Sequence, residues 1–389
     1  MKILHLNPAF FPAFSYGGIV NVSYNLCKAL AKRGHDVTVY TSDTFDKCNR
    51  QSMRYLEHEG IKIFYFKNIS NLLAWHRFLF YPHLITALKK NIKQFDIIHL
   101  HGTRNFQNVV AVHYAKKYDI PYVLQAHGSL PYFSQHEGLK KLFDTLFGKS
   151  IFCNIGKALA LNQTEYEQYV AKGVPKNKIE ILPNGISSSE PIDPQQGIFK
   201  KKYGINNSER IILYVGRIHR TKGLDNLIRA FTIVNKVEEN TLLILLGPDD
   251  NYKKELTQLS RELNIQDRVR FVGFVPDEDK FSAYVDSEVF VTPSFSGFPI
   301  TFLEACACGL PIITTNSGDQ LEWIHDNVGL VVDDNVEQIS MAIIRIISSQ
   351  SLRKYFGERG VHIVREQFNW DSIINKLDRM YTEIIDETR

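Results

Sequence analysis

Arg217 and Lys222 are two basic residues that flank a turn between an apolar segment and a segment expected to be helical. Residues 211–215 form a short apolar run that ends at Gly216, and the helix is expected to begin at residue 224. A helix N-terminus favours an anion, and a guanidinium and an ammonium can together hold a diphosphate. The same groups would stabilise the charge that grows on a departing diphosphate. A solvated basic turn is the alternative interpretation.

Glu304 is a lone carboxylate in an apolar, small-residue run that is also expected to be helical. The segment 291–313 begins as a strand that ends in Pro-Ser, turns at Gly297-Phe298-Pro299 and continues into this helix. A buried carboxylate without partners is costly, so Glu304 should meet either protein donors or ligand hydroxyls. Carboxylates suit the vicinal hydroxyls of a ribose, and a core salt bridge is the alternative.

The acids at 277–279 spell Asp-x-Asp, a pattern that can hold a divalent metal on a diphosphate. They follow a Val-Pro pair at the point where a helix is expected to begin. Acidic residues are enriched there because they interact favourably with the helix dipole. We therefore expect no metal and no cofactor, with Arg217 and Lys222 in the role that a metal would take.

The elements that must position these residues alternate between short apolar, β-rich runs and amphipathic stretches, which predicts βαβ units and parallel sheets. Strands are expected at 2–6, 36–41, 61–66, 96–100, 121–126, 158–161, 179–182, 210–216, 241–247, 269–274, 288–292, 311–314 and 329–332. Helices are expected at 18–33, 82–94, 105–118, 139–149, 164–172, 224–236, 251–263, 277–284, 300–308, 335–349 and 351–387. Residues 183–200 are rich in Pro, Gly and Ser and indicate a linker between two α/β domains.

The composition is that of an ordinary globular protein, with 44% hydrophobic and 23% charged residues among 389. No apolar run reaches the roughly 18–20 residues of a membrane-spanning helix. Residues 1–6 are expected to form a buried strand rather than a signal peptide. The cysteines are scattered and are expected to be reduced thiols, so we expect a cytoplasmic protein.

The charge is distributed unevenly between the two halves. Residues 1–190 hold 23 basic against 13 acidic side chains, a net charge of +10, and residues 191–389 hold 23 against 29, a net charge of −6. A basic first half predicts contact with something anionic, such as a phosphorylated acceptor or a membrane surface. The alternative is that the asymmetry serves only solubility. Nucleic acid is not expected as a partner, because the lysines form no dense basic stripe.

Taken together, these motifs resemble the family 4 glycosyltransferases, which are retaining enzymes with the two-domain GT-B fold. The second half of the chain carries Gly-Arg, Lys-Gly, Pro-Ser, Gly-Phe-Pro, Leu-Glu-Ala and Gly-Leu-Pro. Further matching segments are 15–18 (Ser-Tyr-Gly-Gly), 125–128 (Gln-Ala-His-Gly), 181–186 (Ile-Leu-Pro-Asn-Gly-Ile) and 368–371 (Phe-Asn-Trp-Asp). The resemblance therefore extends over nearly the full chain.

The resemblance implies two Rossmann-like β/α/β domains that face each other across a cleft. The expected division is an acceptor domain at 1–185, a linker at 186–203, a nucleotide-sugar domain at 204–368, and a C-terminal helix at 369–389 that packs back on the first domain. The expected activity is transfer of a sugar, with retention and without metal, from a UDP- or GDP-sugar to a glycan or lipid-linked saccharide. This places the protein in cell-surface polysaccharide or glycolipid biosynthesis.

The resemblance also implies roles at matching positions. Arg217 and Lys222 would bind the donor diphosphate, and Glu304 would bind the ribose hydroxyls. His127 would contact the donor sugar or the leaving phosphate, with a buried histidine satisfied by backbone as the alternative. Together, His127, Arg217 and Lys222 are the expected catalytic residues. The other expected donor-binding residues are Gly17, Gly18, Gly216, Gly273, Phe274, Val275, Ser296, Gly297, Phe298, Pro299 and Ile300.

Ser296 is a departure from the family pattern. The family shows two glutamates separated by seven residues, and the first would fall at position 296. That glutamate normally meets hydroxyls of the donor sugar. A serine can still form a hydrogen bond but is shorter and uncharged, which puts the identity of the donor sugar in doubt.

Two segments are candidates for a peripheral contact with the inner face of the plasma membrane. Residues 72–90 and 139–149 interleave apolar and basic side chains, and ordinary core-facing helices are the alternative. Competing functions are a sugar-nucleotide epimerase of the same architecture, a retaining phosphorylase, and a catalytically inactive nucleotide-sugar-binding scaffold.

Overall fold

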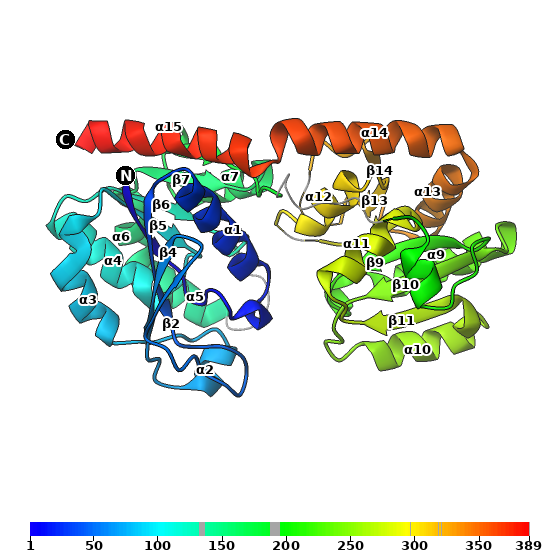
Figure 1. Ribbon diagram of the computed structural model, residues 1–389, viewed down its shortest axis with the longest axis horizontal. Coiled ribbons are helices and arrows are strands. Elements are labelled where there is room, and N and C mark those ends of the chain that lie inside the picture. Colours follow the sequence, from blue (N-terminus) through cyan, green and yellow to red (C-terminus); the bar gives the residue numbers. More distant parts are fainter. Residues whose placement is uncertain (132–136, 187–194, 296, 318, 320, 389) are drawn as a thin grey trace. The chain divides into compact units, whose positions relative to one another are not determined.

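The computed structural model describes residues 1–389 except 132–136, 187–194, 296, 318, 320 and 389. Contacts within the chain divide it into two compact units. The first unit holds Met1–Gly185 together with Trp370–Arg389, and the second holds Ile186–Asn369. Each unit is an α/β domain built on a mainly parallel sheet, as the alternating pattern predicts (Figure 1).

The first unit has an eight-stranded sheet with the order β3-β4-β2-β1-β5-β6-β7-β8. Its strands are β1 (Lys2–Leu6), β2 (Asp36–Ser42), β3 (Tyr55–His58), β4 (Ile61–Phe66), β5 (Ile97–His101), β6 (Tyr122–Gln125), β7 (Lys157–Ala160) and β8 (Ile179–Ile181). All neighbours pair in parallel except β3 and β4. Strands buried on both faces read as apolar runs, whereas the edge strand β3 is largely exposed, and the sequence did not predict it.

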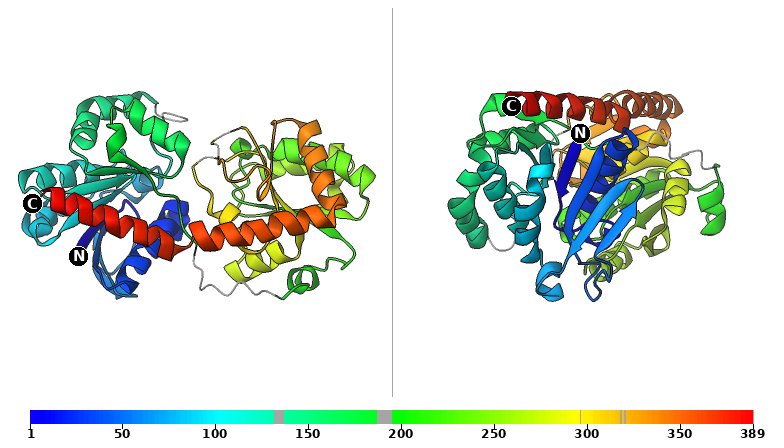
Figure 2. Two further views of the ribbon diagram at one scale, coloured as in Figure 1. Left: turned by 90° about the horizontal axis from the view of Figure 1, so that it is seen from above. Right: turned by 60° about the vertical axis from the view of Figure 1, so that its left-hand side comes forward.

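Helices cover both faces of this sheet. On one face α1 (Gly18–Lys32) and α15 (Trp370–Thr388) lie side by side over a core shared with β1, β2 and β5 (Figure 2). The opposite face packs against α3 (His83–Asn91), α4 (Phe106–Lys117), α6 (Lys149–Cys153) and α7 (Gln163–Ala171). The unit also contains α2 (Asn71–Trp75), α5 (Glu137–Phe143) and a π-helical segment (Asp144–Gly148).

The second unit has a six-stranded sheet with the order β11-β10-β9-β12-β13-β14, parallel throughout. Its strands are β9 (Arg210–Val215), β10 (Thr241–Leu246), β11 (Val269–Gly273), β12 (Ser287–Thr292), β13 (Ile312–Thr315) and β14 (Gly329–Val332). Its helices are α8 (Ile198–Lys202), α9 (Leu224–Val237), α10 (Lys253–Glu262), α11 (Asp277–Val285), α12 (Ile300–Ala307), α13 (Val336–Ser348) and α14 (Gln350–Gln367).

The linker and the C-terminal tail also differ from the sequence-based expectation. The short helix α8 falls within residues expected to form the linker, where Asp286 accepts hydrogen bonds from the amides of Gly197 and Lys200. The helical tail is two helices, because α14 ends at Gln367 and α15 begins at Trp370. The Asn369 side chain, between them, donates a hydrogen bond to the Arg365 carbonyl in the last turn of α14. None of the helices in the described part of the chain is both long and apolar enough to cross a bilayer.

Candidate functional site

Four loops of the second unit leave the carboxyl ends of β9, β10, β11 and β12. Because these strands are parallel neighbours, the loops emerge at one edge of the sheet, where α/β proteins bind ligands. The loop after β9 carries Gly216 and Arg217, and a 3₁₀ turn (Arg220–Lys222) leads from it to α9. Gly223 has a φ of 65°, and a Cβ there would lie 3.0 Å from Pro293 Cβ. The loops after β9 and β12 therefore touch at a position that favours glycine.

Arg217 and Lys222 have different surroundings within this edge. Arg217 Nη1 donates to Asp250 Oδ2 at 2.7 Å, and both side chains are exposed. Lys222 is half-buried, and its ammonium forms no hydrogen bond or ion pair with any residue that the structure describes. Burial, followed by the Arg217 charge, lowers the pKa of Lys222 from its usual 10.5. A half-buried cation without a counter-ion is unfavourable, so this arrangement can bind an anion.

Glu304 is buried on α12 and is paired within the unit. Its carboxylate oxygens accept hydrogen bonds from Lys280 Nζ at 2.7 Å and from the Tyr284 hydroxyl at 3.0 Å. Burial, followed by the Glu304 charge, raises the pKa of Tyr284 well above its usual value, so the hydroxyl stays protonated. Protein donors therefore supply partners for Glu304, and each carboxylate oxygen keeps a second lone pair that a ligand hydroxyl could reach.

The predicted residues after β11 lie at the same sheet edge. Gly273 ends the strand with a φ of 89°, and its carbonyl accepts from the Gly247 amide at 2.8 Å. Phe274 is 80% exposed, whereas Val275 is only 9% exposed. A ring as exposed as that of Phe274 is free to stack on a ligand.

The predicted residues after β12 are only partly described, because Ser296 lies outside the described residues. Residues 297–300 lead directly into α12. Gly297 has a φ of 74° and its amide donates to the Asp319 carboxylate, while Phe298 is buried. This turn therefore places the N-terminus of α12 at the candidate edge.

The Asp-x-Asp acids occupy the first turn of α11 and pair with protein groups. Asp277 forms an ion pair with Lys280 at 2.8 Å. Asp279 accepts hydrogen bonds from Lys202 Nζ at 2.7 Å and from the Tyr203 hydroxyl at 3.0 Å. The expected preference of helix N-termini for acids accounts for their position.

In the first unit the candidate residues follow β1 and β6. Gly17 (φ 96°) and Gly18 lie at the start of α1, and a Cβ at either would meet nothing within 4 Å. His127 has a φ of 54°, a left-handed conformation that is unfavourable for a residue with a side chain. Its half-buried ring is hydrogen-bonded through Nε2 to His101 Nδ1 at 2.9 Å. Burial lowers the pKa of His127 to about 3, so the ring is neutral near pH 7.

Two acidic residues that the sequence analysis did not single out hold these loops. Glu165 is 3% exposed and accepts hydrogen bonds from the amides of Gly128 at 2.6 Å and Leu161 at 2.7 Å. A helix-capping pattern, Asn-x-x-Glu at 162–165, was the available signal for it. No sequence pattern singles out Asp250, because it reaches Arg217 only through the pairing of β10 with β9.

Comparisons with protein families match both halves of the chain. A model described as "Glycosyltransferase Family 4" matches residues 16–190, and one described as "Glycosyl transferases group 1" matches residues 195–362. N-acetyl-alpha-D-glucosaminyl L-malate synthase of Bacillus anthracis is 25% identical over 391 residues, 95% of each chain. The O-antigen biosynthesis glycosyltransferase WclY of Escherichia coli is 25% identical over 303 residues, which cover 77% of this chain and 82% of that protein.

Solved structures share the fold over nearly the full length. HepE of Anabaena in complex with UDP-glucose has a TM-score of 0.76 at 19% identity, covering 98% of this chain and 100% of that one. Sucrose-phosphate synthase of Thermosynechococcus elongatus has a TM-score of 0.76 at 21% identity, covering 100% of both chains. At these identities the likeness is one of fold.

Proposed function

The chain belongs to glycosyltransferase family 4 and has the GT-B fold, and from this premise we propose that it transfers a sugar with retention from a nucleotide-diphosphate sugar. Lys222 is the observation that carries the proposal. Its ammonium is half-buried near the Arg217 charge, at the start of α9, without a counter-ion among the described residues. A donor diphosphate would supply that negative charge.

The proposed reaction needs no residue as a separate base. The bond between the sugar's anomeric carbon and the diphosphate oxygen breaks, and an acceptor hydroxyl bonds to the same face of that carbon. The hydroxyl proton passes to the departing diphosphate oxygen, whose charge Arg217 and Lys222 stabilise together with the amides of α9. Arg217 would exchange its Asp250 partner for the diphosphate, and Glu304 would accept from the ribose hydroxyls.

The names of related proteins support the substrate classes without fixing them. HepE was solved with UDP and with UDP-glucose, and a mannosyltransferase of Mycobacterium tuberculosis is named as GDP-mannose-dependent. The latter acts on a phosphatidylinositol monomannoside by its name, and WclY is named for O-antigen biosynthesis. We therefore propose a UDP- or GDP-sugar as the donor and a glycan or lipid-linked saccharide as the acceptor.

Thermal shift with UDP, GDP and their sugar derivatives tests this proposal. A ligand that binds only the folded state raises Tm by mass action, so one nucleotide series should stabilise the protein at millimolar concentration, equally with and without chelator. Arg217→Ala should abolish the shift. A shift that requires a divalent metal would overturn the metal-free part, and no shift with any nucleotide would overturn the donor site.

The assay also separates the competing functions. A sugar-nucleotide epimerase would convert the donor with no acceptor present, and a phosphorylase would require inorganic phosphate. An inactive scaffold would bind the donor and turn over none of a broad acceptor panel. Transfer that depends on a saccharide acceptor excludes all three.

We further propose that the segment 137–149 docks on an anionic lipid surface. Leu139, Leu142 and Leu146 are 53%, 54% and 63% exposed, and no residue of α5 is buried. Lys140 and Lys141 lie among them and add positive charge to this half of the chain. Apolar side chains interleaved with lysines suit the interface of an anionic bilayer.

Co-sedimentation with phosphatidylglycerol vesicles tests this docking. The wild-type protein should pellet at low salt and less so at high salt, because salt screens the lysine charges. The double variant Leu142→Glu/Leu146→Glu should lose binding, whereas Val237→Glu, at a 62% exposed site on α9, should keep it. Equal binding to neutral phosphatidylcholine vesicles, or none to either, would contradict the proposal.

A further inference from the structure

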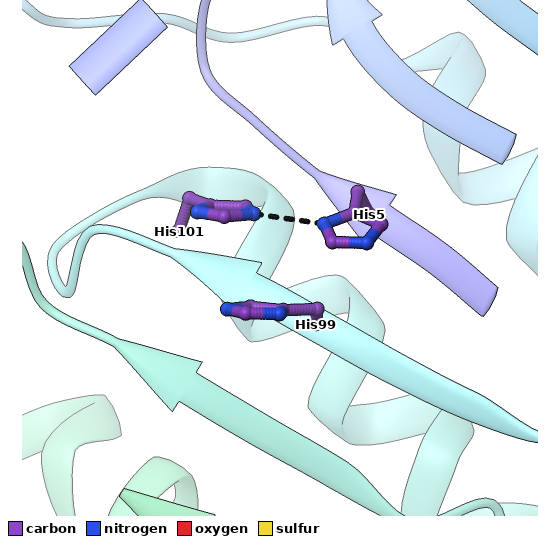
Figure 3. A group of neighbouring side chains, drawn as sticks. All are labelled: His5, His99 and His101. Carbon is purple, nitrogen blue, oxygen red and sulfur yellow. Dashed lines mark hydrogen bonds between the residues drawn. The ribbon is translucent and has the colours of Figure 1, made fainter. Parts of the chain in front are cut away.

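Three histidines lie together in the interior of the first unit, on the sheet face covered by α1 and α15. His5 is on β1 and pairs in register with His99 on β5, and His101 lies two residues further along β5. Residues two apart on a strand point to the same face, so the register and the spacing gather all three rings. Each residue is 0% exposed. Figure 3 shows the three rings as a compact group.

A shared metal ion does not fit this arrangement, although the candidate ligand nitrogens lie within 4.8 Å of one another. The rings of His99 and His101 are stacked, with centroids 4.3 Å apart and planes 5° from parallel (Figure 3). An imidazole binds a metal along a nitrogen lone pair, which lies in the ring plane. Two parallel rings stacked face to face have no point in common along those directions. The contact between His5 and His101 is instead a hydrogen bond.

This hydrogen bond belongs to a series of two hydrogen bonds, the histidine chain, that ends at His127, a candidate residue of the first unit. His5 Nδ1 and His101 Nε2 are 3.0 Å apart, and His101 Nδ1 and His127 Nε2 are 2.9 Å apart. A neutral imidazole has one donor nitrogen and one acceptor nitrogen. The proton positions of the three rings are therefore linked, and His101 must donate to one neighbour while it accepts from the other.

The inner end of the chain favours one of the two directions. His5 Nε2 is sealed from solvent and has no partner in the described part of the protein. Buried N–H groups are rarely left unpaired, and unpaired acceptors are tolerated somewhat better. His5 should therefore keep Nε2 bare and donate from Nδ1. His101 then donates from Nδ1 to His127, which must carry its own proton on Nδ1.

We propose that His5 and His101 are positioning residues that hold His127 as the neutral Nδ1–H tautomer, so that it presents a hydrogen-bond donor to an acceptor oxygen of a ligand bound at this loop of the first unit. The inference rests on the proposed function for the identity of that ligand. His127 Nδ1 has no partner among the described residues and is not sealed from solvent, so it is the open end of the chain. The Nδ1–H group that His127 offers to a ligand belongs to a neutral ring and carries no positive charge.

The electrostatics of the chain support neutral rings. Burial lowers the pKa of His5 and of His127 to about 3. Burial, followed by the charges of neighbouring histidines, lowers the pKa of His101 well below its usual value. Long-distance proton transfer is also disfavoured, because a proton that reached His5 Nε2 would find no acceptor there. The hydrogen-bonded histidines therefore fix the direction of the hydrogen bonds and do not conduct protons.

Nitrogen-15 NMR of histidine-labelled full-length protein reads this tautomer directly. His127 should be protonated on Nδ1 and bare on Nε2, without titrating between pH 5.5 and 8. His101→Leu removes the hydrogen-bond donor to His127, so His127 should become a mixture of tautomers. His101→Asn places an amide N–H near the position of Nδ1, so it can donate to His127 and should keep the Nδ1–H tautomer. His99→Leu is the matched control, because it removes a buried ring that lies outside the chain and should leave the His127 tautomer unchanged.

Several outcomes would overturn the inference: an Nε2–H tautomer in the wild type, an unchanged tautomer in His101→Leu, or zinc bound in stoichiometric amount and lost in His99→Leu. In transfer assays, His101→Leu should lower kcat/KM about tenfold, because His127 loses the hydrogen bond that orients it. His101→Asn should recover the activity. The NMR result stands without any activity. A protein that shows the expected His127 tautomer but transfers no sugar would contradict the proposed function, whereas the inference that His5 and His101 fix this tautomer would stand.

Discussion

Replacing Lys222 with alanine is expected to lower kcat/KM for sugar transfer by about 10²–10³-fold, the usual effect of removing one preorganised donor to a developing negative charge. Most of the loss should fall on kcat. The charge on the diphosphate grows as the glycosidic bond breaks, so the ammonium interacts more strongly with the transition state than with the ground state. Steady-state kinetics with the nucleotide sugar found by thermal shift would measure the effect.

Lys236→Ala is the matched control, since Lys236 is an exposed lysine in the last turn of the same helix. It should retain activity within about twofold, because surface substitutions away from a site have small effects. Lys222→Arg should recover only part of the activity, because a planar guanidinium does not replace a compact ammonium. If Lys222→Ala turned over at the wild-type rate, the proposal that this turn binds the diphosphate would be wrong.

The basic turn could be predicted from the sequence because its parts are adjacent in the chain. A buried strand, Gly216, Arg217 and a helix start lie within 15 residues, and each has a local signature. The counter-ion of Arg217 could not be predicted in the same way. Asp250 is 33 residues away and reaches the guanidinium only because β10 lies beside β9. Sheet order is a tertiary property that strand periodicity does not encode.

The histidine chain illustrates the same limit in the first unit. A histidine within a strand is unremarkable by itself, and the His-x-His spacing of β5 shows only that two rings share a face. The third ring joins them because β1 pairs with β5 in the register His5 opposite His99. The sequence predicted His127 as a site residue by resemblance, and the residues behind it became visible only with the strand pairing.

Buried elements were predicted better than exposed ones. The predicted strands of both sheets are present within one or two residues, because burial on both faces leaves long apolar runs. The exposed edge strand β3 and the short helices α2 and α8 were not predicted, because segments of four or five residues are too short to show a periodicity. The stripe at 139–149 shows the converse, since its spacing is helical but its leucines face solvent. Periodicity indicates a helix, and it does not say what covers the apolar side.

Glu165→Ala is expected to destabilise the first unit by about 2–4 kcal/mol, because two buried or partly buried amides would each lose a charged acceptor. Those amides belong to Gly128, beside His127, and to Leu161, which lies between β7 and α7. The carboxylate therefore ties the loop after β6 to the helix after β7. Urea unfolding followed by tryptophan fluorescence and circular dichroism would measure the loss.

The same change should also reduce transfer more than stability alone accounts for. His127 is held in the left-handed region, and the hydrogen bond from Gly128 to Glu165 is one of the contacts that keeps it there. Glu165→Gln retains one acceptor oxygen and should fall between wild type and Glu165→Ala in both stability and kcat. Glu167→Ala, at an exposed site two residues along α7, should match the wild type. If Glu165→Ala is destabilised but keeps full kcat at low temperature, the carboxylate supports the fold alone, and the loop geometry at His127 does not depend on it.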